Sequence, residues 1–397
     1  MGPAGNHTRN KESHMAKPAY QGFEVGPIRP PSEHASLLLR ITRNCPWNKC
    51  KFCTLYKGQS FSVRSTQDVK ADIDAIRLYV DFFRQSEGVP AYQRDREYTA
   101  LMARLGPGGE AALQSAAAWY HAGMESVFLQ DANTMVVRPD DLVEILEYLR
   151  AAFPEIRRVT SYGRSHTIAR ISDGDLARIA RAGLNRIHIG MESASDHVLA
   201  LVDKGVDKKT HIEAGRKVKK AGIELSEYYM PGLGGREYAR ENALETADAL
   251  NQINPDFIRI RSLAVKRGSL LQSDYERGIF TRANDTDTVR ELELFVEHLS
   301  GIDSAVKSDH ILNLIPELDG TLPRDREAML AALRWYLALP EEDKVIFRVG
   351  RRTGYMGGIS DFQKPGLRAA VAHICENNQV NSNTVDGVIE SLMGRFI

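Results

Sequence analysis

The chain has 397 residues, of which 43% are hydrophobic and 26% are charged, the composition of an ordinary soluble globular protein. Its 52 Lys and Arg residues are balanced by 52 Asp and Glu residues, so the composition does not indicate a strongly basic nucleic-acid surface. No apolar run reaches the roughly 18–20 residues that a membrane span requires, and four cysteines are too few for a disulfide framework. We therefore expect a cytoplasmic protein without a membrane partner.

Residues 1–18 are polar and tag-like, and we expect them to be disordered and outside the fold. After them, short apolar runs alternate with amphipathic helical patterns as far as residue 265. The expected strands are Ser36–Thr42, Ser126–Leu129, Arg158–Tyr162, Arg186–Gly190, Glu224–Met230 and Phe257–Leu263. This alternation predicts a parallel sheet with helices outside it. The fold class is therefore α/β, and six strand–helix units predict a partial (β/α)6 barrel over residues 19–265.

Two segments depart from this pattern. The first crossover, residues 66–125, is much longer than the others and carries helical patterns at 66–84 and 109–122, so we interpret it as an inserted helical element. After residue 263 the alternation stops, and residues 266–397 read as a mainly α-helical C-terminal region. The helices expected there are 285–300, 323–339, 363–376 and 383–394.

The C-terminal region also contains a basic, glycine-rich stretch. Arg348, Arg351 and Arg352 stand among four glycines, a pattern typical of a loop that closes over an anionic substrate. A loop exposed to solvent is the simpler interpretation.

Three of the four cysteines lie within nine residues, directly after the first expected strand. They are Cys45, Cys50 and Cys53, in a C-x4-C-x2-C pattern, with the aromatic Phe52 beside the last of them. Thiolates this close repel one another unless a cation or a cluster holds them. We interpret them as three ligands of a [4Fe–4S] cluster with one open iron. The alternatives are inert thiols or a zinc site, which would require a fourth ligand.

The strand, the three-cysteine loop and the six strand–helix units together resemble the radical S-adenosylmethionine (SAM) superfamily over about residues 35–265. The usual family spacing is C-x3-C-x2-C, so this chain has one additional residue between Cys45 and Cys50. The resemblance implies one cluster held by three cysteines, with SAM bound at the open iron. It further implies an external one-electron donor (flavodoxin or ferredoxin) and reductive cleavage of SAM to a 5′-deoxyadenosyl radical that abstracts hydrogen from substrate.

Candidate SAM-binding residues follow the second and third expected strands. Gln130, Asp131 and Asn133 lie where the resemblance places contacts to the SAM amino group, with a helix cap or an Asx-turn as the alternative. Tyr162 and Arg164 share a face of the third strand because side chains alternate with a period of two. We expect them to line the SAM pocket or the substrate mouth; an ordinary tyrosine at the sheet end and a surface arginine are the alternative.

The fourth expected strand carries Gly190 followed by Glu192, which resembles the family motif that contacts the SAM ribose or amino group. Ser193 is a candidate beside it, or a helix cap. Lys204 falls where relatives similar to oxygen-independent coproporphyrinogen oxidase place an arginine that faces the SAM carboxylate. Without that resemblance, Lys204 is a cation at a helix end.

The fifth expected strand contains the polar residues Ser226, Glu227 and Tyr228. Polar groups in a parallel strand that is buried on both faces require a partner, which favours contact with a cofactor. Arg259 and Arg261, on one face of the sixth strand, are expected to meet an anionic substrate or to form ion pairs.

The leading interpretation is a radical SAM enzyme that acts on a small-molecule substrate. The same chemistry on RNA or a peptide is the first alternative, and the balanced charge together with the lack of a recognisable RNA module argues against a nucleic-acid partner. A non-catalytic iron–sulfur electron-transfer protein is the second. Three clustered cysteines argue against it, because an electron carrier normally has full protein ligation.

Overall fold

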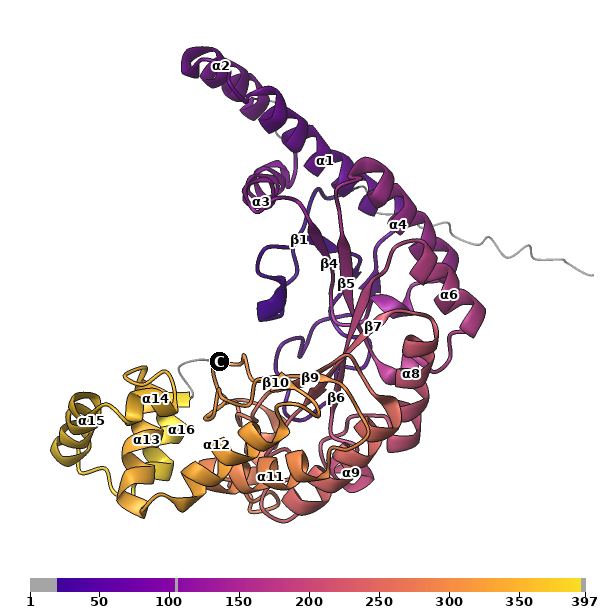
Figure 1. Ribbon diagram of the computed structural model, residues 1–397. Helices are drawn as coiled ribbons and strands as arrows, with labels where there is room; N and C mark the ends of the chain where they lie inside the picture. Colours follow the sequence, from indigo (N-terminus) through magenta and orange to yellow (C-terminus); the bar gives the residue numbers. More distant parts are fainter. Residues whose placement is uncertain (1–19, 104–105, 394–397) are drawn as a thin grey trace, which may run out of the picture.

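A computed structural model describes residues 20–103 and 106–393. The tag-like segment expected over residues 1–18 lies outside the described residues. A central eight-stranded sheet runs in the order β1-β4-β5-β6-β7-β8-β9-β10, with helices along its outer side (Figure 1). The α/β fold class and the partial barrel of parallel strands are confirmed.

The six expected strands form the parallel part of this sheet. They are β1 (Leu37–Arg40), β4 (Ser126–Gln130), β5 (Arg158–Gly163), β6 (Arg186–Glu192), β7 (Glu224–Tyr229) and β8 (Phe257–Ile260). Tyr162 on β5 lies opposite His188 on β6, which lies opposite Ser226 on β7. Because paired residues of parallel strands point to the same side, these three side chains share the inner face of the sheet.

The expectation that strand–helix alternation stops after residue 263 was wrong. Helix α11 (Asp285–His298) leads to β9 (Ala305–Lys307), which pairs parallel with β8, and β10 (Gly320–Thr321) pairs antiparallel with β9. These two strands have only three and two residues, which is too short for a period of two to be recognised.

Helices cover the outer face of the sheet (Figure 1). They are α4 (Pro139–Ala152), α6 (Asp173–Arg181), α8 (Lys208–Lys220) and α9 (Ala239–Ile253). Polar caps define where they begin: Ser172 accepts a hydrogen bond from the Asp175 N–H at α6, and Asp207 accepts one from the Thr210 N–H at α8. These caps satisfy backbone donors that the first helical turn leaves without partners.

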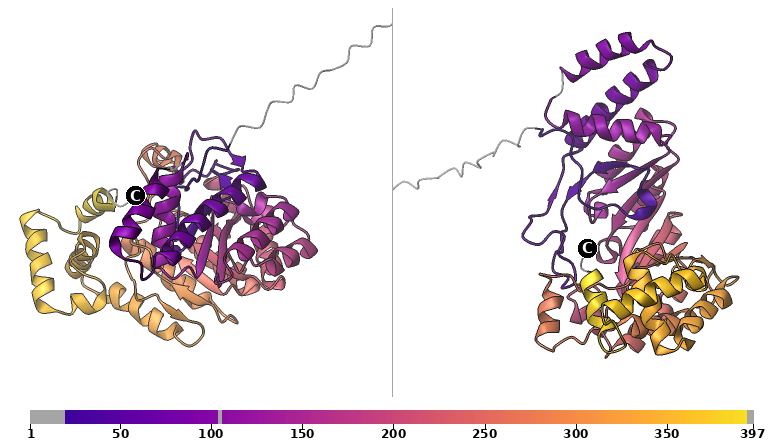
Figure 2. Two further views of the ribbon diagram at one scale, coloured as in Figure 1. Left: turned by 90° about the horizontal axis from the view of Figure 1, so that it is seen from above. Right: turned by 90° about the vertical axis from the view of Figure 1, so that its left-hand side faces the viewer.

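The long first crossover is helical, as predicted, and contains α1 (Thr66–Gln85), α2 (Ala91–Met102) and α3 (Gly109–His121). Helix α2 was not expected, because its sequence is polar and lacks an apolar stripe. Helix α1 packs against α3 and α4, whereas α2 projects away from the sheet (Figures 1 and 2).

The C-terminal region is mainly helical. Its helices are α10 (Leu270–Glu276), α12 (Arg326–Ala338), α13 (Glu341–Thr353), α14 (Ile359–Phe362), α15 (Pro365–Asn377) and α16 (Val385–Met393). Helices α13 to α16 gather at one end of the molecule, beyond the short strands β9 and β10 (Figure 1). Among the described residues, no helix combines the length and the apolar character that crossing a membrane would take.

The interpretation of the three C-terminal arginines as a loop was wrong, because they lie on α13. Arg348 and Arg352 are buried and both bind the Asp285 carboxylate, at 3.1 and 2.6 Å. Arg351 donates to the Leu314 carbonyl oxygen at 2.9 Å. These side chains join α13 to the start of α11, so they stabilise the attachment of the C-terminal helices.

A buried carboxylate on α11 supports the loop that follows β7. Glu291 accepts hydrogen bonds from the Tyr229 hydroxyl (2.7 Å), the Asn242 amide (2.6 Å) and the Gly232 N–H (2.9 Å). Burial raises the pKa of Glu291 to about 7, although the three donors favour the ionised form.

This raised pKa predicts a pH-dependent stability. The contribution of Glu291 to stability is fully present below its ordinary pKa of 4.5 and is lost as the pH rises through about 7. We therefore expect the advantage of the wild type over Glu291→Gln, measured as free energy of unfolding in urea, to shrink by about 1.4 kcal/mol per pH unit between the ordinary pKa of 4.5 and about pH 7 and to stay constant at higher pH. An equal difference at about pH 6 and about pH 8 would contradict this assignment.

Candidate active site

The cysteine loop lies at the carboxyl edge of the sheet, where α/β folds place their chemistry. It is bounded by a small antiparallel pair, β2 (Thr42–Arg43) and β3 (Ser62–Val63). Cys45, Cys50 and Cys53 are free thiols with intermediate exposure. The Asn48 N–H donates to the Cys45 sulfur at 3.4 Å, and this bond turns the loop back on itself.

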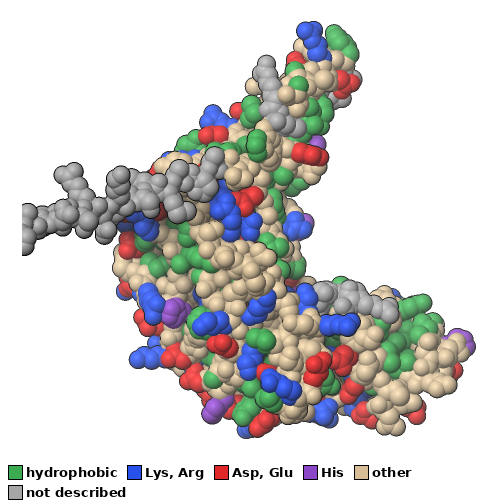
Figure 3. All heavy atoms as spheres, turned by 180° about the vertical axis from the view of Figure 1, so that it is seen from behind, with side chains coloured by type: hydrophobic (Ala, Val, Ile, Leu, Met, Phe, Trp, Pro, Cys, Tyr) green, Lys and Arg blue, Asp and Glu red, His purple; other side chains and the backbone are tan. Residues whose placement is uncertain are grey.

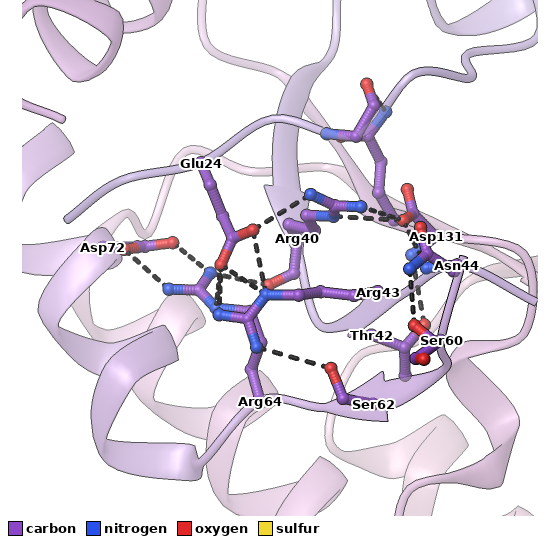
Figure 4. A network of polar contacts seen from close by, with 12 residues as sticks. Glu24, Arg40, Thr42, Arg43, Asn44, Ser60, Ser62, Arg64, Asp72 and Asp131 are labelled. Atoms are coloured by element: carbon purple, nitrogen blue, oxygen red, sulfur yellow. Dashed lines mark hydrogen bonds and ion pairs between the residues drawn. The ribbon is translucent and has the colours of Figure 1, made fainter. Parts of the chain in front are cut away.

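A charged network holds the start of this loop (Figure 4). Arg40 donates to one Asp131 oxygen through Nε and Nη2, at 3.0 and 2.7 Å, and the Asn44 N–H donates to the same oxygen at 2.9 Å. Asn44 immediately precedes Cys45. Glu24, from the segment before β1, binds Arg40 and Arg64, each at 2.9 Å. The network therefore connects the first cysteine to β1, to β4 and to the N-terminal segment.

Two cations, Arg164 directly after β5 and Lys204 in a turn after α7 (Asp196–Leu201), lie near the cysteine loop. Burial raises the pKa of the Cys50 thiol, and the charges of Lys204 and Arg164 act in the opposite direction. Nearby cations favour the thiolate form, which is the form that binds metals.

The donor set fits an iron–sulfur cluster. Among the described residues, no three His, Cys, Asp or Glu side chains gather closely enough to hold one metal ion. In a cubane cluster each thiolate binds a different iron, so its ligands need not converge on one point. Three free thiols in one loop, with cations beside them, match that requirement.

Glu192 and Lys204 lie together next to Gly190. Lys204 Nζ is 3.4 Å from Glu192 Oε1, whereas Glu192 Oε2 is buried without a hydrogen-bond partner. A Cβ at Gly190 would lie 2.5 Å from Glu192 Oε1, so the glycine leaves room for the carboxylate. Glu227 is buried on the neighbouring strand, and both of its oxygens lack partners. Burial, with the Glu192 charge adding to it and Lys204 opposing it, raises the pKa of Glu227 well above its ordinary value.

The inner face of the barrel carries a group of aromatic and polar side chains. The rings of Tyr162 and Tyr228 each lie 5.8 Å from the His188 ring, and the two tyrosines share a hydrogen bond. Burial raises the pKa of Tyr228 to about 12, so its hydroxyl stays neutral. The hydroxyl of Ser226 is buried without a partner. Buried polar atoms without partners are uncommon in proteins. Here they indicate a surface where a ligand or water would supply the missing hydrogen bonds.

Other candidate residues are engaged in holding loops. Gln130 accepts from the Gly26 N–H at 2.8 Å and donates to the Gly26 and Ile28 carbonyl oxygens. Asn133 accepts from the Arg164 N–H at 3.1 Å, and Ser193 accepts from the Ser195 N–H at 3.0 Å.

Two further candidates have apolar or ionic surroundings. Phe52 packs in a small cluster with Val202, Leu233 and Leu263, and the Lys204 ammonium lies 5.7 Å from its ring centre. Arg259 pairs with Asp309, as the ion-pair alternative predicted, whereas Arg261 is exposed.

The sequence reasoning missed three residues that hold the loop: Arg40, Asn44 and Trp47. In the sequence, Arg40 is a single charged residue at the end of an otherwise apolar strand. Such a residue indicates that the fold supplies a partner of opposite charge. Asn44 has a positive φ of 67°, a conformation that asparagine tolerates better than most residues. Trp47 gave no local signal, because the carbonyl oxygen that its indole N–H binds, that of Asp203, lies 156 residues away in the chain.

Taken together, the parallel partial barrel and its three-thiol loop define the class of α/β proteins that hold an iron–sulfur cluster with an open coordination site. Residues 39–247, more than half of the chain, match the family model of the radical SAM superfamily. The chain belongs to this superfamily. It is therefore a radical SAM enzyme, with a [4Fe–4S] cluster and SAM as its cofactors.

Individual relatives are more distant. A 114-residue stretch, 29% of this chain, is 26% identical to an uncharacterized protein of Methanocaldococcus jannaschii. A 119-residue stretch, 30% of this chain, is 23% identical to the tRNA uridine(34) acetyltransferase of Methanocaldococcus infernus. The matches cover 35% and 22% of the lengths of these two relatives.

Solved structures with a related fold include the coproporphyrinogen III oxidase of Escherichia coli, a radical SAM enzyme. It is 14% identical with a TM-score of 0.38, and the match covers 58% of this chain and 44% of that chain. Methylornithine synthase is 12% identical with a TM-score of 0.41, and the match covers 76% of this chain and 81% of that chain.

Proposed function

We propose that Cys45, Cys50 and Cys53 hold the cluster, and that Lys204 and Glu192 bind the carboxylate and the ribose or amino groups of SAM. The observation that carries this proposal is the position of Lys204, whose charge acts on both Cys50 and Glu192. When bound, the two cofactors supply an electron and a 5′-deoxyadenosyl radical that abstracts hydrogen from substrate.

The remaining residues have different roles in this proposal. Asp131, Gln130 and Asn133 are positioning residues, because their hydrogen bonds hold the cysteine loop, the N-terminal segment and the start of the Arg164 loop. Tyr162, Ser226 and Tyr228 line the inner surface of the barrel, where they exclude water and orient the reacting groups. Phe52 provides an apolar wall beside Cys53.

We propose a small molecule as the substrate and an external flavodoxin or ferredoxin as the electron donor. A cavity of about 300 Å³ lies between the loop after β8 and helices α11, α13 and α16, and it contacts Ser262, Leu263, Arg348 and Arg352. Its volume suits a small ligand. Leu263, which lines this cavity, packs against the same apolar cluster as Phe52.

RNA is the second candidate substrate, because one relative is named as a tRNA-modifying enzyme. Against it, three of the five lysines of α8 are engaged with acidic side chains: Lys208 binds Glu245, Lys219 binds Asp256 and Lys220 binds Asp173, at 2.6 to 2.7 Å. On the face seen in Figure 3, basic and acidic side chains are interspersed. Fluorescence anisotropy with tRNA at low and moderate salt decides: specific binding that persists at moderate salt would favour RNA.

The proposed chemistry is tested by anaerobic reconstitution of the full chain with iron and sulfide. We expect about four irons and four sulfides per chain. Dithionite and SAM should then yield 5′-deoxyadenosine, and deuterium from the correct labelled substrate should appear in that product. Material that binds a cluster but leaves SAM intact would overturn the proposal.

Lys204 offers a sharper test of SAM binding. We expect Lys204→Ala to weaken SAM binding about 10-fold to 100-fold, the effect of one lost charged hydrogen bond. Lys204→Arg should retain most of the affinity, because it keeps the charge. Lys209→Ala, which changes an exposed lysine on α8, is the matched control and should bind SAM as the wild type does. Equal affinity in Lys204→Ala and Lys209→Ala, measured by equilibrium filtration, would exclude this role.

A further inference from the structure

Three consecutive carbonyl oxygens, those of Val202, Asp203 and Lys204, accept hydrogen bonds from the site. Val202 accepts from the Lys51 N–H at 2.9 Å. Asp203 accepts from the Trp47 indole N–H at 2.7 Å, and Lys204 accepts from Arg164 Nη2 at 2.7 Å. The turn that follows α7 (Asp196–Leu201) therefore supplies backbone acceptors to both the cysteine loop and the Arg164 guanidinium.

The shape of this turn depends on Gly205. Its φ is +69°, and a Cβ there would lie 2.1 Å from a carbon of the Trp47 ring. Asp203, two residues earlier, also has a positive φ, of 52°. The indole thus lies directly on the glycine, and a larger residue would have to push it away.

Two cations contact the Trp47 ring, one from the site and one from the solvent side. The Arg164 guanidinium carbon lies 5.1 Å from the Trp47 ring centre, and Lys49 Nζ lies 4.9 Å from it. Such contacts stabilise a ring beyond its buried area. Arg164 also donates to the Lys204 carbonyl oxygen, so the indole is linked to the turn through this side chain as well.

We propose that Trp47 and Gly205 form a clamp that sets the position of the Cys45–Cys50 segment relative to Lys204. Trp47 lies within the four residues that separate Cys45 from Cys50. Anchoring its ring therefore fixes the path of the segment that contains the additional residue. Trp47 is a positioning residue in this assignment. The proposal rests on the proposed cluster and SAM sites, because it concerns how the cluster loop and the SAM-binding lysine are kept in register.

The clamp is tested first in the metal-free protein. Trp47→Phe removes the indole N–H, and Gly205→Ala adds the methyl group that collides with the ring. We expect both changes to raise the rate at which maleimide alkylates the loop thiols, about fivefold to tenfold, the effect of one lost hydrogen bond. Peptide mapping assigns the alkylated cysteine.

Matched controls separate the clamp from general destabilisation. Trp119→Phe also removes an indole N–H that donates to a backbone carbonyl, that of Ser126 at 2.8 Å. Gly222→Ala places a methyl group at a similar φ of +75° with no atom within 4 Å. We expect both controls to lower the melting temperature but to leave the thiol alkylation rate unchanged.

The reconstituted proteins provide the second measurement. We expect Trp47→Phe and Gly205→Ala to retain iron but to alter the EPR spectrum of the reduced cluster and the change that SAM produces in it. The clamp is overturned if their alkylation rates and spectra match those of the wild type, or if Trp119→Phe and Gly222→Ala change both equally. A wild type that takes up no cluster would refute the proposed function, and the alkylation rates would still decide whether the clamp exists.

Discussion

Replacing Cys50 with alanine should abolish the cluster, and Cys45→Ala and Cys53→Ala should do the same. Each thiol is one of three ligands in this assignment, and the loss of a ligand should exceed the roughly 10-fold to 100-fold effect of changes outside the ligand set. We expect iron and sulfide to fall far below four per chain, the cluster absorption to disappear, and 5′-deoxyadenosine formation to drop more than about 100-fold.

Cys375→Ala is the matched control for these variants. Cys375 is buried on α15, in the C-terminal helices, and its pKa is raised by burial, so it behaves as an apolar side chain. The variant should keep full iron content and activity. If Cys375→Ala also loses iron, or if Cys50→Ala keeps it, the assignment of the three ligands is incorrect.

The second large effect is expected at Asp131. Asp131→Asn removes a fully buried charge, and Arg40, which is also largely buried, loses one of its two carboxylate partners and keeps Glu24. Breaking a buried pair from one side costs about 3–5 kcal/mol. We therefore expect a loss of that size in the free energy of unfolding, together with lower iron uptake, because the Asn44 N–H next to Cys45 loses an anionic acceptor.

An exposed pair on the same protein provides the comparison. Arg138 donates to both oxygens of Asp141, at 2.8 and 2.7 Å, at the start of α4, where Arg138 is largely exposed to solvent. Because surface pairs contribute about 0–1 kcal/mol, Asp141→Asn should change stability little and leave iron uptake intact. Urea unfolding of both variants measures the difference. Equal losses would mean that the Arg40 network does not support the cysteine loop.

The sequence predicted the parallel sheet well, because apolar runs and helix caps are local signals. At α6, Ser172 caps the start and Gly183, with a φ of 114°, follows the end, and both residue types favour these positions. The three-cysteine loop was equally clear. By contrast, β9 and β10 are too short to carry a pattern, and the end of α13 was interpreted as a loop because its arginines stand among glycines.

The roles within the site were harder to predict than its place. Asp131 and Asn133 were expected to contact SAM because they follow a strand, and that expectation used only their position. Their hydrogen bonds go to Asn44 and Arg40, and to Arg164 and Thr167, while Asp131 Oδ1 has no partner, so contact with SAM stays a prediction. A strand pattern shows which residues reach the sheet edge. It does not show which neighbouring donors form hydrogen bonds with the oxygens of these residues.

The chain's local chemistry was enough to predict a metal-binding loop after the first strand, because the thiols are adjacent and strand–helix alternation has a recognisable period. Folding decided how that loop is held. Trp47 meets the Asp203 carbonyl across 156 residues, and Arg40 meets Asp131 across 91. Contacts between such distant residues depend on how strands and helices pack in three dimensions, and no periodicity along the chain records them.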